Sequence, residues 1–377
     1  AEAGATFRLL SSLAGEVGTG TASGGGTYGL TASPLGEGVH NLSVEATDAA
    51  GNVTSSGSLA VTIDVTAPGV PSGLDLLAAD DTGVSGSDNI TNHTTPRVTG
   101  QADSGTTVRL SSSLDGAVGS GTANGPFTIE TDALSEGVHQ LTATAEDLAG
   151  NVSGASAALA VTIDVTALAV SVPDLEAGSD TGSSDSDNVT RDTTPSFTGT
   201  AEAGSSVKLL SSVAGEVANG AANGGGSYAL TSVALAEGVH QMRVEATDVA
   251  GNVTSSGALT VTLDVTAPGV PGGLDLLAAD DTGRSATDNL TSHTTPRISG
   301  SAESGTTVNL SSDKEGPVGD GPATGGVFTI ETGALTEGDH SMTATATDAA
   351  GNVSGVSVAL VVAVDTTAPV VSVPDLE

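Results

Sequence analysis

The sequence has no cysteine and no tryptophan, and only 9 of its 377 residues are lysine or arginine. Without cysteine, both a disulfide scaffold and a thiolate metal site are excluded. The 45 acidic residues give a formal net charge of −36. This charge argues against nucleic acid or an anionic membrane surface as a partner, because both are bound through lysine and arginine. The best apolar run is only residues 359–364, so we expect no membrane insertion.

One segment, TIDVTAP or a near copy, recurs along the chain with its aspartate at Asp64, Asp164, Asp264 and Asp365, a period of 100, 100 and 101 residues. This period is typical of a self-contained domain rather than of a solenoid repeat. The sequence therefore predicts domains at residues 65–164, 165–264 and 265–365, preceded by an N-terminally truncated copy at 1–64 and followed by the start of another at 366–377. No signal peptide opens the chain, so we expect it to be an excerpt from a longer protein.

Within each copy, apolar and polar residues alternate, as in Leu141, Ala143 and Ala145. Short alternating runs separated by Gly, Asn, Asp and Ser clusters are typical of an all-β immunoglobulin-like sandwich of about seven strands. The pattern predicts strands at 74–77, 97–102, 107–112, 127–131, 139–146 and one ending at 164, with a Gly-rich hairpin before 127. We expect Tyr28 and Tyr228 in the core. The truncated first copy should expose apolar edges.

Three acidic positions recur in every copy. They are Glu2, Asp103, Glu202 and Glu303 in one turn, Asp48, Asp147, Asp248 and Asp348 opening a loop of sequence Asp-x-Ala-Gly-Asn, and Asp64, Asp164, Asp264 and Asp365 ending the last strand. We call residues 48–52, 147–151, 248–252 and 348–352 the DxAGN loops. In a sandwich, the two turns share the pole at which the preceding copy enters. We therefore expect three groups to converge, namely Asp64 with Asp103 and Asp147, Asp164 with Glu202 and Asp248, and Asp264 with Glu303 and Asp348.

Three carboxylates repel one another unless a cation lies between them. Oxygen ligands without His or Cys favour Ca²⁺, so the sequence predicts calcium at the junctions. The loop asparagines Asn151, Asn252 and Asn352 would add amide or backbone oxygens.

A second candidate calcium site is the long polar loop at residues 80–96. We call this loop and its counterparts at 179–195 and 280–296 the acidic loops. The predicted ligands are Asp81, Ser85 and Asp88, with Asp180 and Asp187, and with Asp281 and Asp288, in the later copies. An irregular loop with two acids, a glycine and a hydroxyl can wrap calcium, although this is not EF-hand spacing.

Other interpretations of these residues remain open. Asp-x-Ala-Gly-Asn is also a good turn sequence, since Asp and Asn cap turns and tolerate left-handed φ. The Asn-x-Ser/Thr triplets at Asn52, Asn89, Asn151 and Asn188 match the glycosylation sequon. His139 and its counterparts follow Glu-Gly at the start of a strand, which indicates a structural corner rather than a metal ligand.

Three segments in order, LDLLAADDTGVSGSDNITNHTTPRVTGQA, EGVHQLTATAEDLAGNVS and VTIDVTAP, resemble the tandem bacterial immunoglobulin-like (BIg) domains of giant RTX-type adhesins. The resemblance covers essentially the whole chain. It implies type I secretion from a Gram-negative bacterium, a cell-surface location, and a part in attachment or biofilm formation. In that family the repeats form an extender stiffened by calcium at the junctions, and that role would fall here on Asp64, Asp103, Asp147 and their counterparts. Leu168 replaces the linker proline of Pro68, Pro268 and Pro369, which predicts a more flexible second junction without calcium.

The function that these patterns favour is a calcium-rigidified spacer, an elongated monomeric rod whose partners are calcium ions and neighbouring repeats. The alternative is an adhesive module that binds carbohydrate or protein directly, but the two Tyr and four Phe offer few contact platforms. No enzyme is expected, because every candidate acid, His or Ser recurs in each copy and no nucleophile elbow or phosphate loop is present.

Overall fold

The structure is a computed structural model that describes residues 2–371, and within these residues the regular secondary structure is entirely β. Contacts divide the chain into two compact units. The first unit runs up to Thr166 and includes Val249–Asn252, and the second contains Ala167–Asp248 and the chain from Val253 onward. We refer to residues 1–64, 65–164, 165–264 and 265–365 as the first to fourth repeats.

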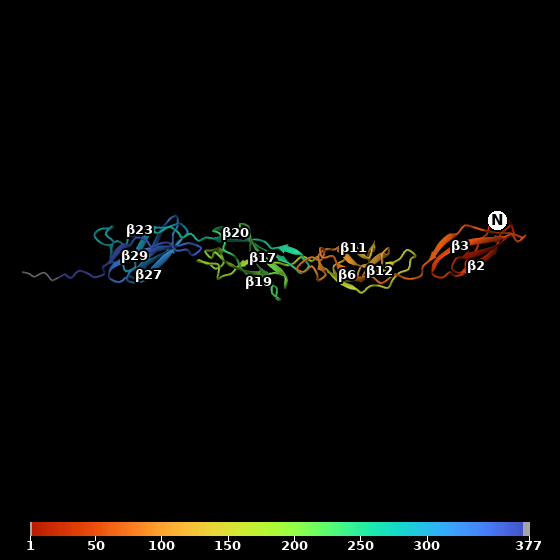
Figure 1. Ribbon diagram of the computed structural model, residues 1–377. Coiled ribbons are helices and arrows are strands. Elements are labelled where there is room, and N and C mark those ends of the chain that lie inside the picture. Colours follow the sequence, from red (N-terminus) through yellow and green to blue (C-terminus); the bar gives the residue numbers. More distant parts are fainter. Residues whose placement is uncertain (1, 372–377) are drawn as a thin grey trace, which may run out of the picture. The chain divides into compact units, whose positions relative to one another are not determined.

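The second repeat, orange to yellow in Figure 1, is a sandwich of two sheets. Its strands are β6 (Ser72–Leu76), β7 (Ile90–Thr91), β8 (Arg97–Gln101), β9 (Thr107–Ser112), β10 (Gly116–Thr122), β11 (Pro126–Glu130), β12 (Gly137–Glu146) and β13 (Leu159–Ile163). One sheet has the order β11-β8-β6, and the other has the order β10-β9-β12-β13-β7. All pairs are antiparallel except β13 with β7.

The core of this repeat lies between the two sheets. Val98 and Ile129 from one sheet pack with Leu110 and Leu141 from the other, and all four are almost fully buried. Inward residues alternate with exposed ones along β9 and β12, as the period of a strand requires. The expected all-β, immunoglobulin-like class is confirmed.

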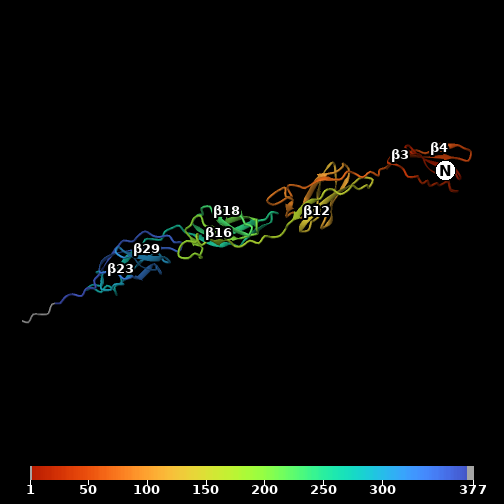
Figure 2. The same cartoon turned by 90° about the horizontal axis from the view of Figure 1, so that it is seen from below.

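The third and fourth repeats have the same two-sheet plan. The third contains β14 (Asp174–Leu175), β15 (Val189–Thr190), β16 (Ser196–Thr200), β17 (Ser206–Ser211), β18 (Gly215–Ala221), β19 (Ser227–Thr231), β20 (Gly238–Thr247), β21 (Val253–Ser255) and β22 (Leu259–Leu263). The fourth contains β23 (Gly272–Leu276), β24 (Leu290–Thr291), β25 (Arg297–Ser301), β26 (Thr307–Ser312), β27 (Gly316–Pro322), β28 (Val327–Glu331), β29 (Gly338–Thr347) and β30 (Leu360–Val364). Each has a three-stranded sheet and a larger one. Figure 2 labels one strand of each sheet in the third repeat, β16 and β18.

The first repeat has one described sheet, with β1 (Thr6–Ser11), β2 (Gly15–Thr21), β3 (Gly38–Thr47), β4 (Val53–Ser55) and β5 (Leu59–Ile63). On the central strand β3, Leu42 and Val44 are only partly buried; the expectation of exposed apolar edges stays a prediction. The expectation that Tyr28 is core is wrong. Tyr28 lies outside any strand, is 46% exposed, and stacks on Phe7 with ring centroids 4.2 Å apart. The strand that pairs with the Tyr228 segment in the third repeat, β16, has no counterpart among the described residues of the first repeat.

The sequence pattern missed two strands of the second repeat. The Gly-rich segment expected as a hairpin forms β10, where Gly119 and Gly121 let the backbone approach β11 closely. A Cβ on Gly121 would lie 2.9 Å from Ile129 Cγ1, and one on Gly119 would lie 3.0 Å from Glu130 O. The acidic loop contains β7, which pairs in parallel with β13 through only two residues.

The repeated histidine is a structural corner, as expected. His139 is fully buried, its Nε2 donates to Ser135 O at 2.7 Å, and its Nδ1 lies 2.8 Å from Ser112 Oγ. The counterparts His40, His240 and His340 make the same two contacts.

Candidate metal sites

The structure brings the three predicted acids of the first junction around one cavity. Asp64, Asp103 and Asp147 line a space of about 510 Å³, together with Glu37 and the linker that joins the first and second repeats. Glu37 was not singled out from the sequence. Its carboxylate accepts a hydrogen bond of 2.7 Å from the hydroxyl of linker residue Thr66.

Hydrogen bonds within the DxAGN loop hold the carboxylate of its aspartate in place. Asp147 Oδ1 accepts hydrogen bonds from the backbone N–H groups of Ala149 and Asn151, both at 2.9 Å, and its Oδ2 accepts from the Asn151 side chain at 2.9 Å. These bonds, that from the Asn151 side chain above all, hold the pKa of Asp147 below its usual value. The carboxylate is therefore ionised and fixed in place near neutral pH. The turn interpretation of this sequence and the ligand interpretation are compatible.

Hydrogen bonds tie this loop and its neighbouring turn to the linker. The Asn151 side-chain nitrogen donates to Asp64 O at 3.1 Å, and Asp103 Oδ2 accepts from Gly69 N at 2.7 Å. Asp64 Oδ1 in turn accepts from Thr66 N at 3.1 Å. Asn151, predicted as an oxygen ligand, thus uses its side-chain nitrogen to connect the two repeats.

The same contacts recur at the third junction, within the second unit. The Asn352 side chain donates to Asp264 O at 2.8 Å and to Asp348 Oδ2 at 3.0 Å, while Glu303 Oε2 accepts from Gly269 N at 3.1 Å.

The remaining junction residues are placed as follows. Glu2 and Asp48 line a cavity of about 310 Å³ in the first repeat. Asn252 donates to Asp164 O at 2.8 Å within the first unit. Glu202 and Asp248 belong to the second unit, so the grouping of these two acids with Asp164 stays a prediction. Asp365 Oδ1 accepts from Thr367 N at 2.9 Å.

In the acidic loop, a buried aspartate faces a second one. Asp81 is 7% exposed, and its Oδ2 accepts from Asn89 N at 3.1 Å. Burial raises the pKa of Asp81, and the negative charge of Asp88 acts in the same direction. Ser85, the third predicted ligand, lies 3.3 Å from Ser87 Oγ. In the later copies Asp187 and Asp288 accept from the backbone N–H two residues on, as Asp88 does.

The donor sets of both candidate sites are oxygen-only, which fits a hard cation such as Ca²⁺. Their geometry is open. Across residues 2–371, no three His, Cys, Asp or Glu side chains lie close enough together to hold a metal ion. A cation at the first junction would therefore have to draw the lining carboxylates inward.

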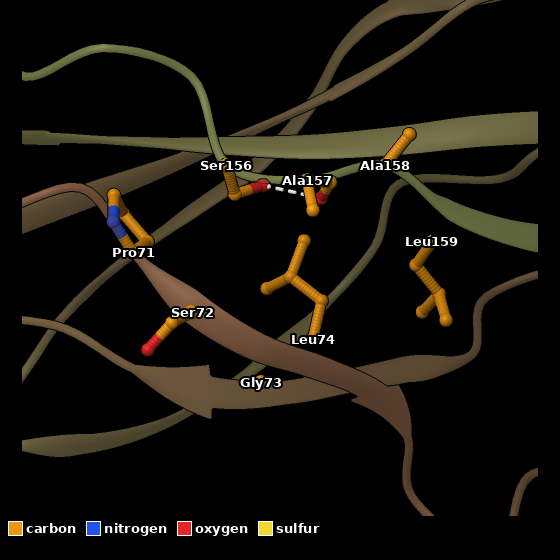
Figure 3. A pocket seen from close by; sticks show the side chains of 8 residues that line it. All are labelled: Pro71, Ser72, Gly73, Leu74, Ser156, Ala157, Ala158 and Leu159. Atoms are coloured by element: carbon orange, nitrogen blue, oxygen red, sulfur yellow. Dashed lines mark hydrogen bonds between the residues drawn. The ribbon is translucent and has the colours of Figure 1, made fainter.

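A further cavity of about 280 Å³ lies at the edge of the second repeat between Pro71–Leu74 and Ser156–Leu159 (Figure 3). Its lining has no titratable side chain, and the Ser156 hydroxyl is held by Ala157 O at 2.8 Å. A similar cavity in the fourth repeat lies beside Leu274. These edges offer apolar packing and no acid–base or metal chemistry.

The comparisons with known proteins agree with this fold. The bacterial Ig-like domain family matches residues 1–65, 67–165, 167–265 and 268–366. The protein is therefore a tandem array of immunoglobulin-like β-sandwich domains. It belongs to the bacterial Ig-like domain family.

One curated relative is Exoglucanase B of Cellulomonas fimi, which is 34% identical over 319 residues. The match covers 81% of this chain but only 26% of the exoglucanase.

No described helix is long and apolar enough to cross a membrane.

Three solved structures show some likeness to this chain. One comes from a 1.5-MDa bacterial ice-binding adhesin (17% identity, 78% of this chain and 96% of that chain, TM-score 0.30). The others are a BSP domain of a biofilm-associated protein (13%, 88% and 76%, 0.20) and fibronectin(III)-like modules of Clostridium thermocellum CbhA (16%, 51% and 94%, 0.32). At these TM-scores, the fold assignment rests on the family match and on the sheets themselves.

Proposed function

We propose that this array is a structural spacer of a bacterial cell-surface adhesin, and that calcium at the junction acids stiffens it. The tandem Ig-like domains and the sequence resemblance to adhesin extenders support the spacer role. The observation that supports the calcium role is the cavity lined by Asp64, Asp103 and Asp147. These three carboxylates come from two successive repeats, in a chain with few cations to balance them.

In this proposal, the three acids hold the ion, and the ion supplies the positive charge that offsets their repulsion. Because Asp64 ends one repeat while Asp103 and Asp147 belong to the next, a shared ion restrains the linker between them. Extracellular calcium modules bind with a Kd of about 10⁻⁴–10⁻³ M. The low calcium of the cytosol would leave the junction loose for export, and calcium outside the cell would stiffen it.

The proposal includes no catalytic role. The candidate acids recur in every repeat, as expected of a structural element rather than of one active site. The match to the exoglucanase gives no reason to assign a catalytic role to this chain, because the chain spans only about a quarter (26%) of that protein.

The absence of cysteine makes spin labelling straightforward, and the first junction can be tested directly. Cysteines replace exposed Thr19 and Ser120, which lie on β2 and β10 of the first two repeats. Their label-to-label distances are measured in the full chain by pulsed electron resonance, in millimolar calcium and in EDTA. We expect a narrow distance distribution with calcium and a broad one without it.

A charge-neutral variant tests the ligands. Asp103→Asn retains an acceptor for Gly69 N but removes one charge, so the distribution should stay broad in calcium. Asp132→Asn is the control, since Asp132 is an exposed acid of the same repeat that does not line the cavity, and it should behave like the parent. Identical distributions in calcium and EDTA for the parent protein would refute the proposal.

A further inference from the structure

The acidic loops of the second and third repeats contact the DxAGN loop of the repeat that follows. Within the second unit, Thr181 Oγ1 donates to Ala350 O at 2.8 Å. Within the first unit, Thr82 Oγ1 donates to Ala250 O at 2.7 Å in the same way. Both acceptors are backbone carbonyl groups, which every DxAGN loop carries whatever its side chains.

The glycine that follows each of these threonines lies against the backbone of the DxAGN loop. A Cβ on Gly182 would overlap the carbonyl oxygen of Ala349, and a Cβ on Gly351 would lie 2.9 Å from Gly182 Cα. In the first unit, a Cβ on Gly83 would overlap the carbonyl oxygen of Val249. The two loops therefore meet backbone to backbone, at a separation that glycine allows and larger residues do not.

Burial of the DxAGN alanine follows this contact. Ala250 and Ala350, which an acidic loop contacts, are 0% exposed. Ala50 and Ala149 have no described acidic loop before them, and both are exposed. Because the four DxAGN loops share one sequence pattern, the difference reflects the contact with the preceding repeat. We call a DxAGN loop in such a contact docked.

The acidic loop has a different conformation where it meets no DxAGN loop. Gly83 and Gly182 have left-handed φ angles of 95° and 110°. Their counterpart Gly283 lies outside the left-handed region, and no DxAGN loop follows it among the described residues. The neighbouring Thr282 Oγ1 lies 3.1 Å from the hydroxyl of Ser292 in its own loop. The same Asp-Thr-Gly sequence thus adopts two backbone conformations.

The DxAGN loop, by contrast, keeps one conformation. Its glycine has φ of 89° at Gly51 and 93° at Gly150, which are undocked, and of 94° at Gly251 and 88° at Gly351, which are docked. Hydrogen bonds to the loop's own aspartate, as at Asp147, hold this shape. The DxAGN loop is therefore preformed, and the acidic loop adapts to it.

We propose that the acidic loop is a docking element with two conformations, and that its partner is the DxAGN loop of whichever repeat follows it. On docking, the glycine takes left-handed φ and the threonine hydroxyl donates to a carbonyl of the partner loop. In the third repeat, Arg191 Nη1 adds a hydrogen bond of 2.7 Å to Gly351 O. Because the acceptors are backbone atoms, docking requires the shape of the DxAGN loop rather than particular side chains in it.

Docking adds a restraint of its own to a junction. None of the atoms in contact is a carboxylate oxygen, so the contact itself requires no metal ion and does not depend on the proposed junction calcium. The third and fourth repeats both lie in the second unit, and there docking holds the two repeats to each other beside their covalent linker. Only this mechanical consequence relates to the proposed spacer role.

Amide hydrogen exchange of the full chain tests docking without any substitution. In millimolar calcium, we expect residues 349–351 to exchange at least roughly tenfold more slowly than the undocked loop residues 148–150, because docking excludes solvent. Equal exchange of the two loops would overturn the proposal. Both loops are measured in one chain and one buffer, so the comparison does not require calcium at the junctions. Its failure can therefore be distinguished from failure of the proposed function.

Gly182→Ala tests the glycine. Its Cβ would overlap the carbonyl oxygen of Ala349 and would disfavour left-handed φ, so exchange at residues 349–351 should rise to the level of the undocked loop. Gly283→Ala is the matched control, because Gly283 is not left-handed and the nearest atom to its Cβ would be a carboxylate oxygen of Asp288, at 3.2 Å. This control should leave the exchange of residues 349–351 unchanged.

Thr181→Val gives a second test that keeps the glycine. Valine has nearly the shape of threonine but no hydroxyl, so the hydrogen bond to Ala350 O is lost and exchange at residues 349–351 should rise by a smaller factor. This variant carries the test if Gly182→Ala does not fold. Unchanged exchange in the folded variants would overturn the proposal.

Spin labels measure the mechanical consequence. Cysteines replace the exposed residues Asn219 on β18 and Asp320 on β27, both in the second unit. By pulsed electron resonance of the full chain in calcium, the parent and Gly283→Ala should give the same narrow label-to-label distribution. Gly182→Ala should give a broader one. A distribution as narrow in Gly182→Ala as in the parent would refute the restraint on the junction.

Discussion

Position 80 and its counterparts show how one buried group can be satisfied in two ways. In the second repeat, the Asp80 carboxylate accepts from Arg97 Nε and Nη2, each at 2.7 Å, and from Arg97 N at 2.8 Å. In the third repeat the residue is Ser179, and the acid has moved to Asp192, whose Oδ2 accepts from Ser179 Oγ at 2.9 Å. The third repeat therefore keeps a hydrogen-bonded pair at this position without the ion pair to arginine.

The fourth repeat, which has the ion pair, should be sensitive to acid here. Hydrogen bonds from Arg297 lower the pKa of Asp280 to about 2, so this stabilisation is complete above the unfolded pKa of about 3.9 and is lost as the pH falls toward 2. Since Arg297 is 43% exposed, solvent screens the pair, and we expect Asp280→Asn to cost about 1–2 kcal/mol at neutral pH. The cost should vanish near pH 2. Urea unfolding followed by the Ile298 amide signal measures it, with the exposed Asp320→Asn as control.

At the scale of strands, alternation predicted most of the fold. The segment 107–112 was predicted with the bounds of β9, and the other predicted strands overlap observed ones. Periodicity could not reveal β10, because a strand with glycine at its inward positions has no alternation to detect. It could not reveal β7 either, since two residues are too few for any pattern.

Strand β10 provides a test of why glycine is needed there. Gly121→Val would place methyl groups where a Cβ already comes within 2.9 Å of Ile129, so we expect overpacking to cost about 1–3 kcal/mol. The neighbouring Ser120→Val faces solvent and should be neutral or slightly stabilising, because valine favours strands. The two variants are compared by denaturant unfolding, with amide exchange in β9 as the readout for the second repeat. Equal effects of the two substitutions would mean that inward packing does not require the glycine.

The candidate sites were predictable to the extent that topology fixes them. Topology and the repeat frame were enough to predict Asp64, Asp103 and Asp147 at one cavity. The donor role of Asn151 depends on which way its amide points, and the part of Glu37 depends on the path of the linker. The hydrogen bond from Thr82 Oγ1 to Ala250 O joins residues 168 positions apart, a separation at which no local pattern carries information.

At the scale of the whole molecule, the chain contains two copies of nearly the same sequence in different surroundings. Residues 1–71 match residues 201–271 closely. Met242 and Val244 on β20 are 0% exposed, because β16 and β19 of the second sheet cover the core. Their counterparts on β3, Leu42 and Val44, are only partly buried. Sequence alone therefore does not set the stability of a repeat, and the facing sheet contributes much of it.

The first repeat should accordingly open more easily than the third. Full burial of one large apolar side chain contributes about 1.5–3 kcal/mol, and the first repeat leaves several such side chains partly exposed. We therefore expect the free energy of opening from amide exchange to be lower by at least about 3 kcal/mol in β3 than in β20. The two strands match at most positions, so each serves as the control for the other. Measured in one sample of the full chain, equal protection of β3 and β20 would show that the single sheet of the first repeat is stable without a partner sheet.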